Sequence, residues 1–179
     1  SMKAPEHLEA LKQFFVNIRA ANVKMQSSKC SFLTTSTLFL GHLVVGPLDP
    51  DRQAGLHKDS ELSDIILKTP LPEDAPALKR FLGQLAFYNA FMENISEATA
   101  SLHQAKNRTP FCLSEEEKAD FRKSLIIFEQ SPALAFLDFE NIKDNPPITG
   151  GDWSDIATSA SLHQWQRGGL RLVGACGRV

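Results

Sequence analysis

The sequence predicts an α+β fold that is mostly helical in its middle and has strands at both ends. Two observations lead to this class. Apolar residues recur at helical spacing in three long segments, and shorter segments near both ends are rich in β-branched residues and bounded by turn residues. With 179 residues, of which 42% are hydrophobic, the chain can form one ordinary domain or two small packed ones without disulfides or metals.

The first predicted element is an amphipathic helix between His7 and Ala21, with Pro5 at a favourable position before its first turn. Its apolar side chains recur on one face: Leu8, Leu11, Phe14, Phe15 and Ile18. Two short strands are predicted next, over residues 29–33 and 38–45, around a turn at 34–36. They would form a β-hairpin closed by Gly46 and Pro47.

The middle of the chain is predicted to be helical. Proline, aspartate and glycine mark residues 47–73 as a connection that contains a short helix at 60–67. Residues 75–94 are dense enough in apolar side chains to form a helix buried on more than one side. A boundary is expected around 107–110.

A further helix is predicted to begin at Ser114, because a glutamate three residues later, Glu117, completes a capping box. It should run to about Glu129. Beyond it, the Pro146-Pro147 pair and paired glycines break helices, and residues 170–175 are predicted to be a strand after a turn at 167–169.

Composition excludes several classes of function. A net charge of −2 argues against a free-standing domain that grips nucleic acid by phosphate neutralisation alone. The three cysteines lie far apart without a CxxC pair, and the five histidines lack ligand spacing, so neither a disulfide framework nor a zinc site is expected. No apolar run is long enough to span a membrane, and no signal peptide is visible. We therefore expect an intracellular protein, cytoplasmic or nuclear.

Six collinear segments resemble gypsy-type LTR-retrotransposon reverse transcriptases, and together they cover almost the whole chain. They resemble, in order, the palm helix and strand after the catalytic YxDD hairpin, the primer grip, the start of the thumb, the thumb helices, the segment leading into RNase H and its first hairpin. The segments are HLEALKQFFVNIRAANVKMQSSKCSF (7–32), FLGHLV (39–44), DPDRQ (49–53), LKRFLGQLAFYNAFMENIS (78–96), SPALAFLDF (131–139) and TGGDWSDIATSASLHQ (149–164).

The resemblance implies three parts: a palm remnant with a primer-grip-like hairpin (1–46), a thumb-like helical region (47–110), and a connecting helix with a truncated RNase H-like segment (111–179). The fold would then comprise a palm-remnant helix and β-hairpin, a helical thumb and a partial RNase H-like sheet.

Asp152 matches the first metal-binding aspartate of the family's RNase H, and Ser154 and Asp155 also agree with that motif. The sequence departs from the pattern in four places, which suggests relaxed selection on catalysis or a divergent element. Trp153 replaces an alanine, Ala157 and Ser159 replace glycines, and Gly177 replaces the serine of a serine-arginine pair.

Phosphodiester chemistry of this kind needs two metal ions held by clustered carboxylates. The chain contains no YxDD motif. Asp152 would also need an acidic partner from a later helix and two further acids beyond that, whereas the sequence ends at Val179. We therefore predict a pseudoenzyme without cofactor, whose intact parent would use Mg²⁺. Asp152 is then a vestigial position, a weak metal ligand at most; a turn or solvated aspartate is the structural alternative.

The nucleic-acid-binding candidates are Phe39, Leu40, Gly41 and His42, which the resemblance assigns to a primer grip with Gly41 allowing close approach. Alternatively, the apolar residues form hairpin core, Gly41 is a bulge and His42 faces solvent. Among the basic residues, Lys79 and Arg80, with Lys106 and Arg108, would face a duplex minor groove and contact phosphates. A solvated helix face is the alternative reading.

Two functions remain open at this stage. The leading hypothesis is a domesticated, non-catalytic protein-interaction scaffold; the alternative is the primer-template-gripping portion of an active reverse transcriptase and RNase H. In the first case another protein or a second copy would cover the open sheet, and nucleic-acid binding would be weak. The predicted partner-binding residues are apolar: Ile148, Leu162, Leu170, Leu172 and Val173.

Overall fold

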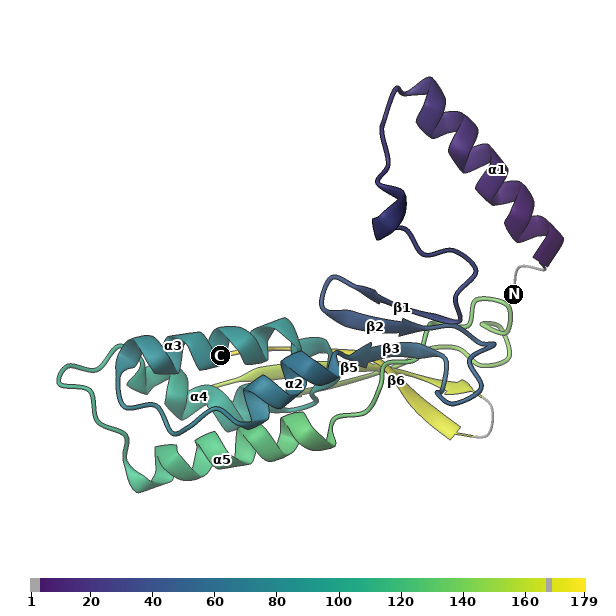
Figure 1. Cartoon of the computed structure of the whole chain (residues 1–179). Helices are drawn as coiled ribbons and strands as arrows, with labels where there is room; N and C mark the ends of the chain where they lie inside the picture. Colours follow the sequence, from purple (N-terminus) through teal and green to yellow (C-terminus); the bar gives the residue numbers. More distant parts are fainter. Residues whose placement is uncertain (1–3, 167–168) are drawn as a thin grey trace.

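The computed structural model describes residues 4–166 and 169–179. It contains a helical body, two antiparallel sheets and an N-terminal helix that stands apart (Figure 1). The elements follow in the order α1 (Ala4–Ala20), η1 (Ser27–Lys29), β1 (Ser36–Phe39), β2 (His42–Val45), β3 (Gly55–Lys58), α2 (Ser60–Leu67), α3 (Ala75–Phe87), η2 (Asn89–Phe91), α4 (Ile95–Ala105), α5 (Glu115–Gln130), β4 (Ile148–Trp153), β5 (Thr158–Gln166) and β6 (Gly169–Arg178). None of the helices in the described ranges is long and apolar enough to cross a bilayer.

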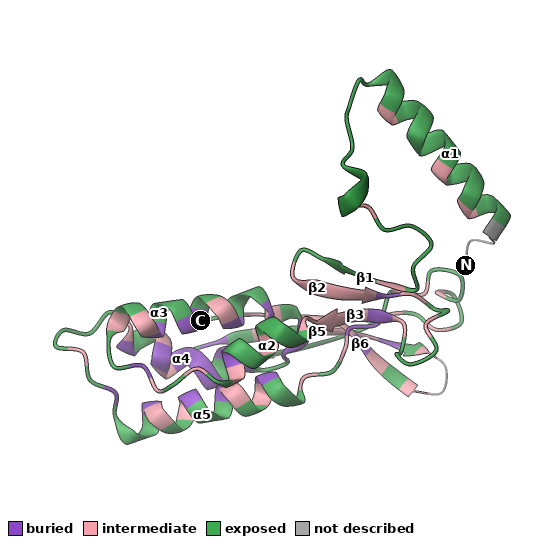
Figure 2. Ribbon diagram, viewed as in Figure 1, coloured by how far each residue is buried: buried purple, intermediate pink, exposed green. Residues whose placement is uncertain are grey.

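Helix α1 confirms the amphipathic helix predicted from periodicity, but its apolar face is open to water. Figure 2 shows the helix exposed along its length, away from the buried positions of the helical body. The ring of Phe15 lies 5.6 Å from that of Phe32 in the segment that follows. The exposed apolar side chains are Leu8, Phe14, Phe15 and Val16.

Strands β1, β2 and β3 form a three-stranded antiparallel meander, which we call sheet A. The predicted strand at 29–33 is wrong, because residues 27–29 form a 3-10 turn and no strand follows until Ser36. The predicted single strand at 38–45 is divided by a turn at Leu40 and Gly41, whose φ angles are 48° and 72°. Two positive φ angles in a two-residue hairpin turn are usually signalled by Asn-Gly, so leucine concealed this turn.

Local sequence signals place the helices of the body. Asp59 caps α2 by accepting hydrogen bonds from two backbone N–H groups, and Asp74 caps α3 in the same way with one. The predicted capping box of Ser114 and Glu117 is confirmed at α5. Helix α3 ends at Phe87, earlier than predicted, and a 3-10 turn over 89–91 continues the segment.

Helices α2 to α5 share one hydrophobic core, which the segment around 107–110 does not interrupt. Helices α4 and α5 pack against each other, and Phe81 on α3 meets Phe121 on α5 with ring centroids 4.5 Å apart. The buried members are Ile66, Leu78, Phe81, Leu82, Leu85, Tyr88, Phe91, Met92, Ile95, Leu102, Ala105, Leu113, Phe121, Phe128, Leu134 and Leu172.

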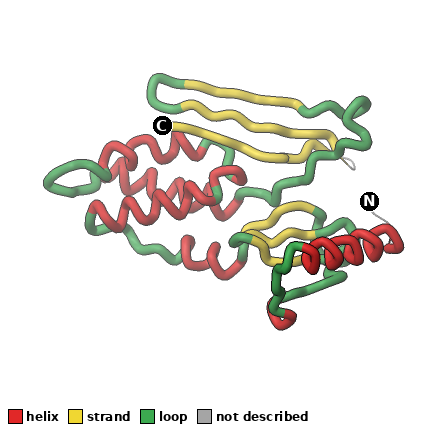
Figure 3. The backbone as a smooth tube through the Cα atoms, turned by 90° about the horizontal axis from the view of Figure 1, so that it is seen from above, coloured by secondary structure: helices red, strands yellow, loops and turns green. Residues whose placement is uncertain are grey.

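Strands β4, β5 and β6 form a second antiparallel meander, sheet B, which runs along one side of the helical body while sheet A and α1 lie on the other side (Figure 3). The predicted strand at 170–175 lies within β6. Two residues of the turn predicted before it, Arg167 and Gly168, lie outside the described residues. Sheet B is fastened to the body by hydrogen bonds from Asn89 Nδ2 to the Gly177 carbonyl, 3.4 Å, and from Ser159 Oγ to Asn94 Oδ1, 3.0 Å.

Leu134 and Ala135 connect the two sheets. Leu134 exchanges two backbone hydrogen bonds with Leu56 on β3, at 2.8 and 2.9 Å, and the Ala135 N–H donates to the Leu172 carbonyl on β6, at 2.7 Å. Gly55 makes this crossing possible, because its φ is 152° and a Cβ there would lie 2.1 Å from the Leu134 carbonyl oxygen. The position of sheet A is therefore linked to that of sheet B.

Candidate nucleic-acid interface

The β1–β2 turn, residues 39–42, presents apolar side chains to solvent. Phe39, directly before the turn, is 62% exposed, and Leu40, the first residue of the turn, is 75% exposed. Leu40 also adopts the left-handed conformation, which costs a non-glycine residue about 1–2 kcal/mol. A strained backbone that carries a largely exposed apolar side chain marks a candidate contact surface.

His42 packs into a group of aromatic rings from the helical body rather than pointing at solvent. Its ring centroid lies 4.8 Å from that of Phe87, 5.4 Å from that of Tyr88 and 5.5 Å from that of Phe91, with which it stacks at 9°. Its Nδ1 lies 3.0 Å from the Leu40 carbonyl oxygen. The imidazole therefore holds the β1–β2 turn against the end of α3.

Gly41 is the second residue of the turn and not a bulge. Its carbonyl oxygen accepts a 3.1 Å hydrogen bond from the Tyr88 hydroxyl. A Cβ at this position would lie 3.1 Å from the Phe87 ring and 3.3 Å from Leu62, and the positive φ also favours glycine. The close approach predicted for this glycine is therefore made by protein side chains.

The outer face of α3, defined here as Lys79, Arg80, Gly83 and Ala86, is exposed and leads toward the same turn. The opposite face, which includes Leu78, is buried in the core. Apart from its chain neighbours and the backbone of its own helix, no described atom lies within 4 Å of where a Cβ on Gly83 would be. Phe87, at the end of α3, is half exposed and touches the turn through His42.

The other two basic candidates have internal roles. The Arg108 guanidinium donates to both carboxylate oxygens of Glu117, at 2.7 and 3.1 Å, and to the Cys112 carbonyl. This bidentate bond holds the pKa of Glu117 below its usual value, although burial opposes the shift. Lys106 Nζ lies 2.7 Å from His103 Nδ1. The pKa of His103 is lowered mainly by burial of its ring and also by the nearby Lys106 ammonium.

Asp152 lies on the exposed strand β4, opposite Ser159. It lines two small clefts beside the start of α4, in the company of Glu93 and Glu97. Within residues 4–166 and 169–179, no three His, Cys, Asp or Glu side chains are grouped to hold a metal ion.

The predicted partner-binding residues are divided between the interior and the surface. Leu172 is 5% exposed and belongs to the core, so its assignment to a partner surface is corrected: it packs within this chain. Leu162 and Val173 are half-buried. Ile148 and Leu170 are 46% and 47% exposed, so these two remain accessible.

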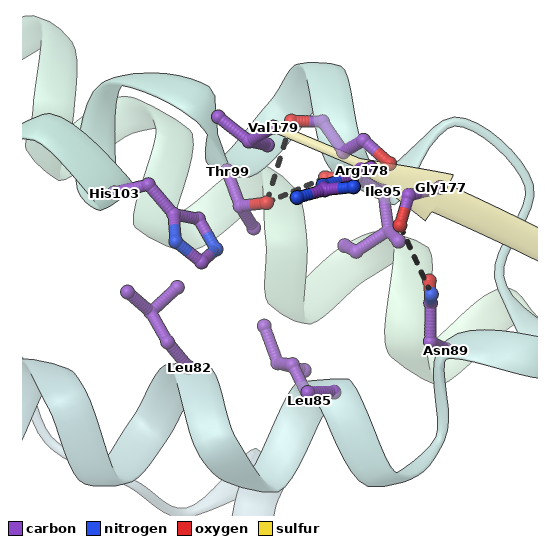
Figure 4. Close-up of a pocket in the computed structure, with 11 residues that line it drawn as sticks. Leu82, Leu85, Asn89, Ile95, Thr99, His103, Gly177, Arg178 and Val179 are labelled. Carbon is purple, nitrogen blue, oxygen red and sulfur yellow. Dashed lines mark hydrogen bonds between the residues drawn. The ribbon is translucent and has the colours of Figure 1, made fainter. Parts of the chain in front are cut away.

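A cavity of about 230 Å³ lies between α3, α4 and the end of β6 (Figure 4). Leu82, Leu85 and Ile95 give it an apolar lining, while Thr99 and Arg178 lie at its polar side. The Thr99 hydroxyl donates to the Ile95 carbonyl of its own helix, at 2.8 Å. The cavity therefore marks the joint between sheet B and the helices.

Sequence reasoning missed the aromatic residues that receive the turn. Phe87, Tyr88 and Phe91 were assigned only to a buried helix, whereas they contact His42 from the end of α3 and the turn after it. The available signal was the FYNAF cluster at 87–91, which places three aromatic residues within five positions.

No protein-family model matches the chain. The chain is 28% identical over 166 residues to the retrovirus-related Pol polyprotein from transposon 297 of Drosophila melanogaster, which covers 92% of this chain and 15% of that protein. The corresponding protein of transposon 412 is 28% identical over 110 residues, 61% of this chain and 8% of that one. The transposon Tf2-3 polyprotein of Schizosaccharomyces pombe is 22% identical over 167 residues, 92% of this chain and 12% of that one. The chain thus spans about 15% of the first of these relatives.

Solved structures of a foamy viral protease-reverse transcriptase share the fold. The complex with an RNA/DNA hybrid has a TM-score of 0.74 at 19% identity, over 99% of this chain and 23% of that one. A second complex, of the form described as dRH with double-stranded DNA, has a TM-score of 0.77 at 19% identity, over 100% of this chain and 30% of that one. The resemblance to retrotransposon reverse transcriptases predicted from the sequence is confirmed, as is the α+β class.

Proposed function

We propose that this chain, a relative of retrotransposon Pol polyproteins with a reverse-transcriptase-like fold, is the part of a reverse transcriptase that holds the primer-template duplex. The proposed contact surface is the outer face of α3 together with the β1–β2 turn. Similar solved structures are reverse transcriptases in complex with an RNA/DNA hybrid or double-stranded DNA. Duplex binding is a property of those proteins. The arrangement of α3 and the β1–β2 turn supports extending it to this chain.

The observation that carries the proposal is Gly83. Glycine in a helix interior costs about 1 kcal/mol relative to alanine, and here no described neighbour needs the space. Its position on the outer face of α3, after Lys79 and Arg80, explains the cost, because a residue without a side chain lets a groove edge approach the helix. The two cations would then contact phosphates without reading sequence.

The β1–β2 turn would supply the second contact. Lys79 and Phe87 are eight residues apart, which is about 12 Å along the helix axis. Phe87 meets His42, so the two cations, the open glycine and the exposed Leu40 follow one another along the surface. Leu40 would pack against the end of the primer, which explains a strained, exposed leucine.

The exposed face of α1 supports membership of a larger unit. Phe14 and Phe15 are 43% and 45% exposed, whereas an amphipathic helix is normally stabilised by packing that face. We propose that another part of the palm covers it. This chain would then position the duplex, and residues outside it would supply the chemistry, because no carboxylate cluster forms around Asp152 within the described residues.

Direct binding tests the proposal. A fluorescently labelled RNA/DNA hybrid is titrated with the wild type, with Lys79→Glu/Arg80→Glu and with the matched variant Arg122→Glu/Lys123→Glu, which reverses an exposed Arg-Lys pair on α5. We expect weak binding that falls steeply between about 50 and about 200 mM salt. The α3 variant should lose at least about tenfold in affinity and the α5 variant less than about twofold. Equal losses of affinity in the α3 and α5 variants would show that binding depends only on overall charge, which would contradict the proposal.

The interaction scaffold remains the second candidate, and strand β4 favours it. Every residue of β4 is exposed, and the strand lies at the edge of sheet B. Antiparallel pairing with a second copy about Gly150 and Gly151 would place Ile148 opposite Trp153, so the register is self-complementary in apolar contacts. Light scattering tests this candidate: a dimer that Thr149→Lys converts to a monomer supports it, and a monomer at all concentrations excludes self-pairing.

A further inference from the structure

We infer that His42 and Tyr88 are positioning residues that fix the β1–β2 turn to α3, so that the two halves of the proposed duplex surface bind as one rigid unit. The inference rests on the proposed function, but it concerns residues that need not touch nucleic acid. We call the contacts of these two side chains the latch.

The first half of the latch is the orientation of His42. The Leu40 carbonyl can only accept, so the imidazole Nδ1, 3.0 Å away, carries the proton and donates it. This bond ties the ring to the backbone of the turn itself. The ring also stacks on Phe91 and meets Phe87, so one imidazole is held by both the turn and the helical body.

The second half is the Tyr88 hydroxyl. Tyr88 is 1% exposed, and its ring contacts Phe128 on α5 with centroids 5.4 Å apart, so its position is set by the core. From there the hydroxyl donates a 3.1 Å hydrogen bond to the Gly41 carbonyl. The interior of the helical body thus reaches the second residue of the turn directly.

Close packing around Gly41 holds the β1–β2 turn in one position. A Cβ at Gly41 would touch both Phe87 on α3 and Leu62 on α2 at 3.1–3.3 Å, so the turn already contacts two helices. Moving it away would break the Tyr88 bond and the His42 stack together. The exposed Leu40 and the outer face of α3 therefore keep a fixed spacing.

Fixed spacing matters because two weak contacts on a rigid frame act as one stronger contact. Once one half has bound, the other is already in place, and its effective concentration falls if the frame loosens. The halves should therefore be coupled in the wild type and independent when the latch is broken. A residue that only stabilised the fold would change both halves without changing their coupling.

A double-mutant cycle on the full chain tests this, using a labelled RNA/DNA hybrid at low salt. Leu40→Asn removes the apolar tip while keeping a residue that tolerates positive φ, and Lys79→Ala/Arg80→Ala removes the cations. In the wild type we expect the product of the two separate losses to exceed the combined loss by about tenfold. In Tyr88→Phe, and in His42→Asn, that ratio should fall to about one.

A readout without nucleic acid separates the latch from the proposed function. Tyr88 is the single tyrosine of the chain, so fluorotyrosine incorporation gives one fluorine resonance that reports on the latch. We expect His42→Asn to shift or broaden it, and His42→Phe, which keeps the stacking, to restore a sharp line, with unchanged helicity in circular dichroism.

The possible failures are distinguishable. If neither Leu40→Asn nor Lys79→Ala/Arg80→Ala weakens binding, the proposed function fails, whatever the fluorine spectrum shows. If both weaken binding but the coupling persists in Tyr88→Phe and His42→Asn, or the resonance does not respond to His42→Asn, the latch is overturned and the binding surface stands.

Discussion

Gly177 on β6 lies against Ser96 on α4 so closely that a Cβ on the glycine would be 1.7 Å from the serine Oγ. The same glycine carbonyl accepts a hydrogen bond from Asn89 Nδ2, so β6 is fastened to the helical body at this point. Position 177 corresponds to the serine of the serine-arginine pair in the family that the sequence resembles. The departure from that motif is thus explained by packing between sheet B and α4, without reference to catalysis.

We expect Gly177→Ala to destabilise the chain by about 1–3 kcal/mol, because the added methyl group must displace Ser96 or the strand. Ser96→Gly should recover most of that loss in the double variant. Gly174→Ala, on the same strand with no described atom within 4 Å of its would-be Cβ, is the matched control and should be near neutral. Urea unfolding measures all four variants; additive effects of the two substitutions would show that the contact with Ser96 is not the cause.

Gln164 makes a second prediction, about the loop before β4. Its fully buried amide accepts from the Asp138 N–H at 2.8 Å and donates to the Asp138 and Asn145 carbonyls at 3.0 and 2.9 Å. Gln164→Leu leaves three backbone groups without these hydrogen-bond partners. Each of them that stays buried should lower the free energy of unfolding by about 1–3 kcal/mol.

The loop around Asp138 should also become the first site of limited proteolysis in Gln164→Leu. Gln166→Leu is the control, because the Gln166 amide makes fewer bonds to this loop, one to the Phe136 carbonyl. Equal proteolysis of the wild type and both variants would mean that Gln164 does not hold the loop.

Prediction from sequence succeeded where the signal was local. Periodicity predicted α1, and the pairing of Ser114 with Glu117 predicted the start of α5 to the residue. The β1–β2 turn was missed because Leu40 replaces the asparagine expected at a position with positive φ.

The role of His42 could not be predicted because its three aromatic neighbours lie at least 45 positions away and converge only in the fold. The same holds for Leu172: its strand was predicted, but only the packing of sheet B on the helices shows that this leucine is buried.

The bond between Arg108 and Glu117 predicts a pH dependence of stability. The pKa of Glu117 in the folded chain lies below the usual 4.5, mainly because of that guanidinium. A depressed pKa contributes stability above the unfolded-state value, and the contribution is lost as pH falls through the folded-state value. The free energy of unfolding should therefore decrease below about pH 4.5.

Glu117→Gln should be less stable than the wild type near neutral pH and should show a shallower decrease in acid. Glu116→Gln, the exposed neighbour on the same helical turn, is the control and should follow the wild type. Urea unfolding across this pH range checks the prediction, and parallel curves for Glu117→Gln and the wild type would contradict it.

The last prediction contrasts two phenylalanines. Phe81 is 1% exposed and packs on Phe121, so Phe81→Ala should cost about 3–5 kcal/mol. Phe15 is 45% exposed on α1, so Phe15→Ala should leave the free energy of unfolding of the helical body unchanged.

Since a helix without tertiary packing is marginal at this length, amides of α1 should also exchange much faster than those of α3. Hydrogen exchange measured by mass spectrometry checks this, and chain mass in solution is measured in parallel. Slow exchange in a monomer would show that α1 packs on its own chain, whereas slow exchange only in a dimer would show that a second copy covers its apolar face.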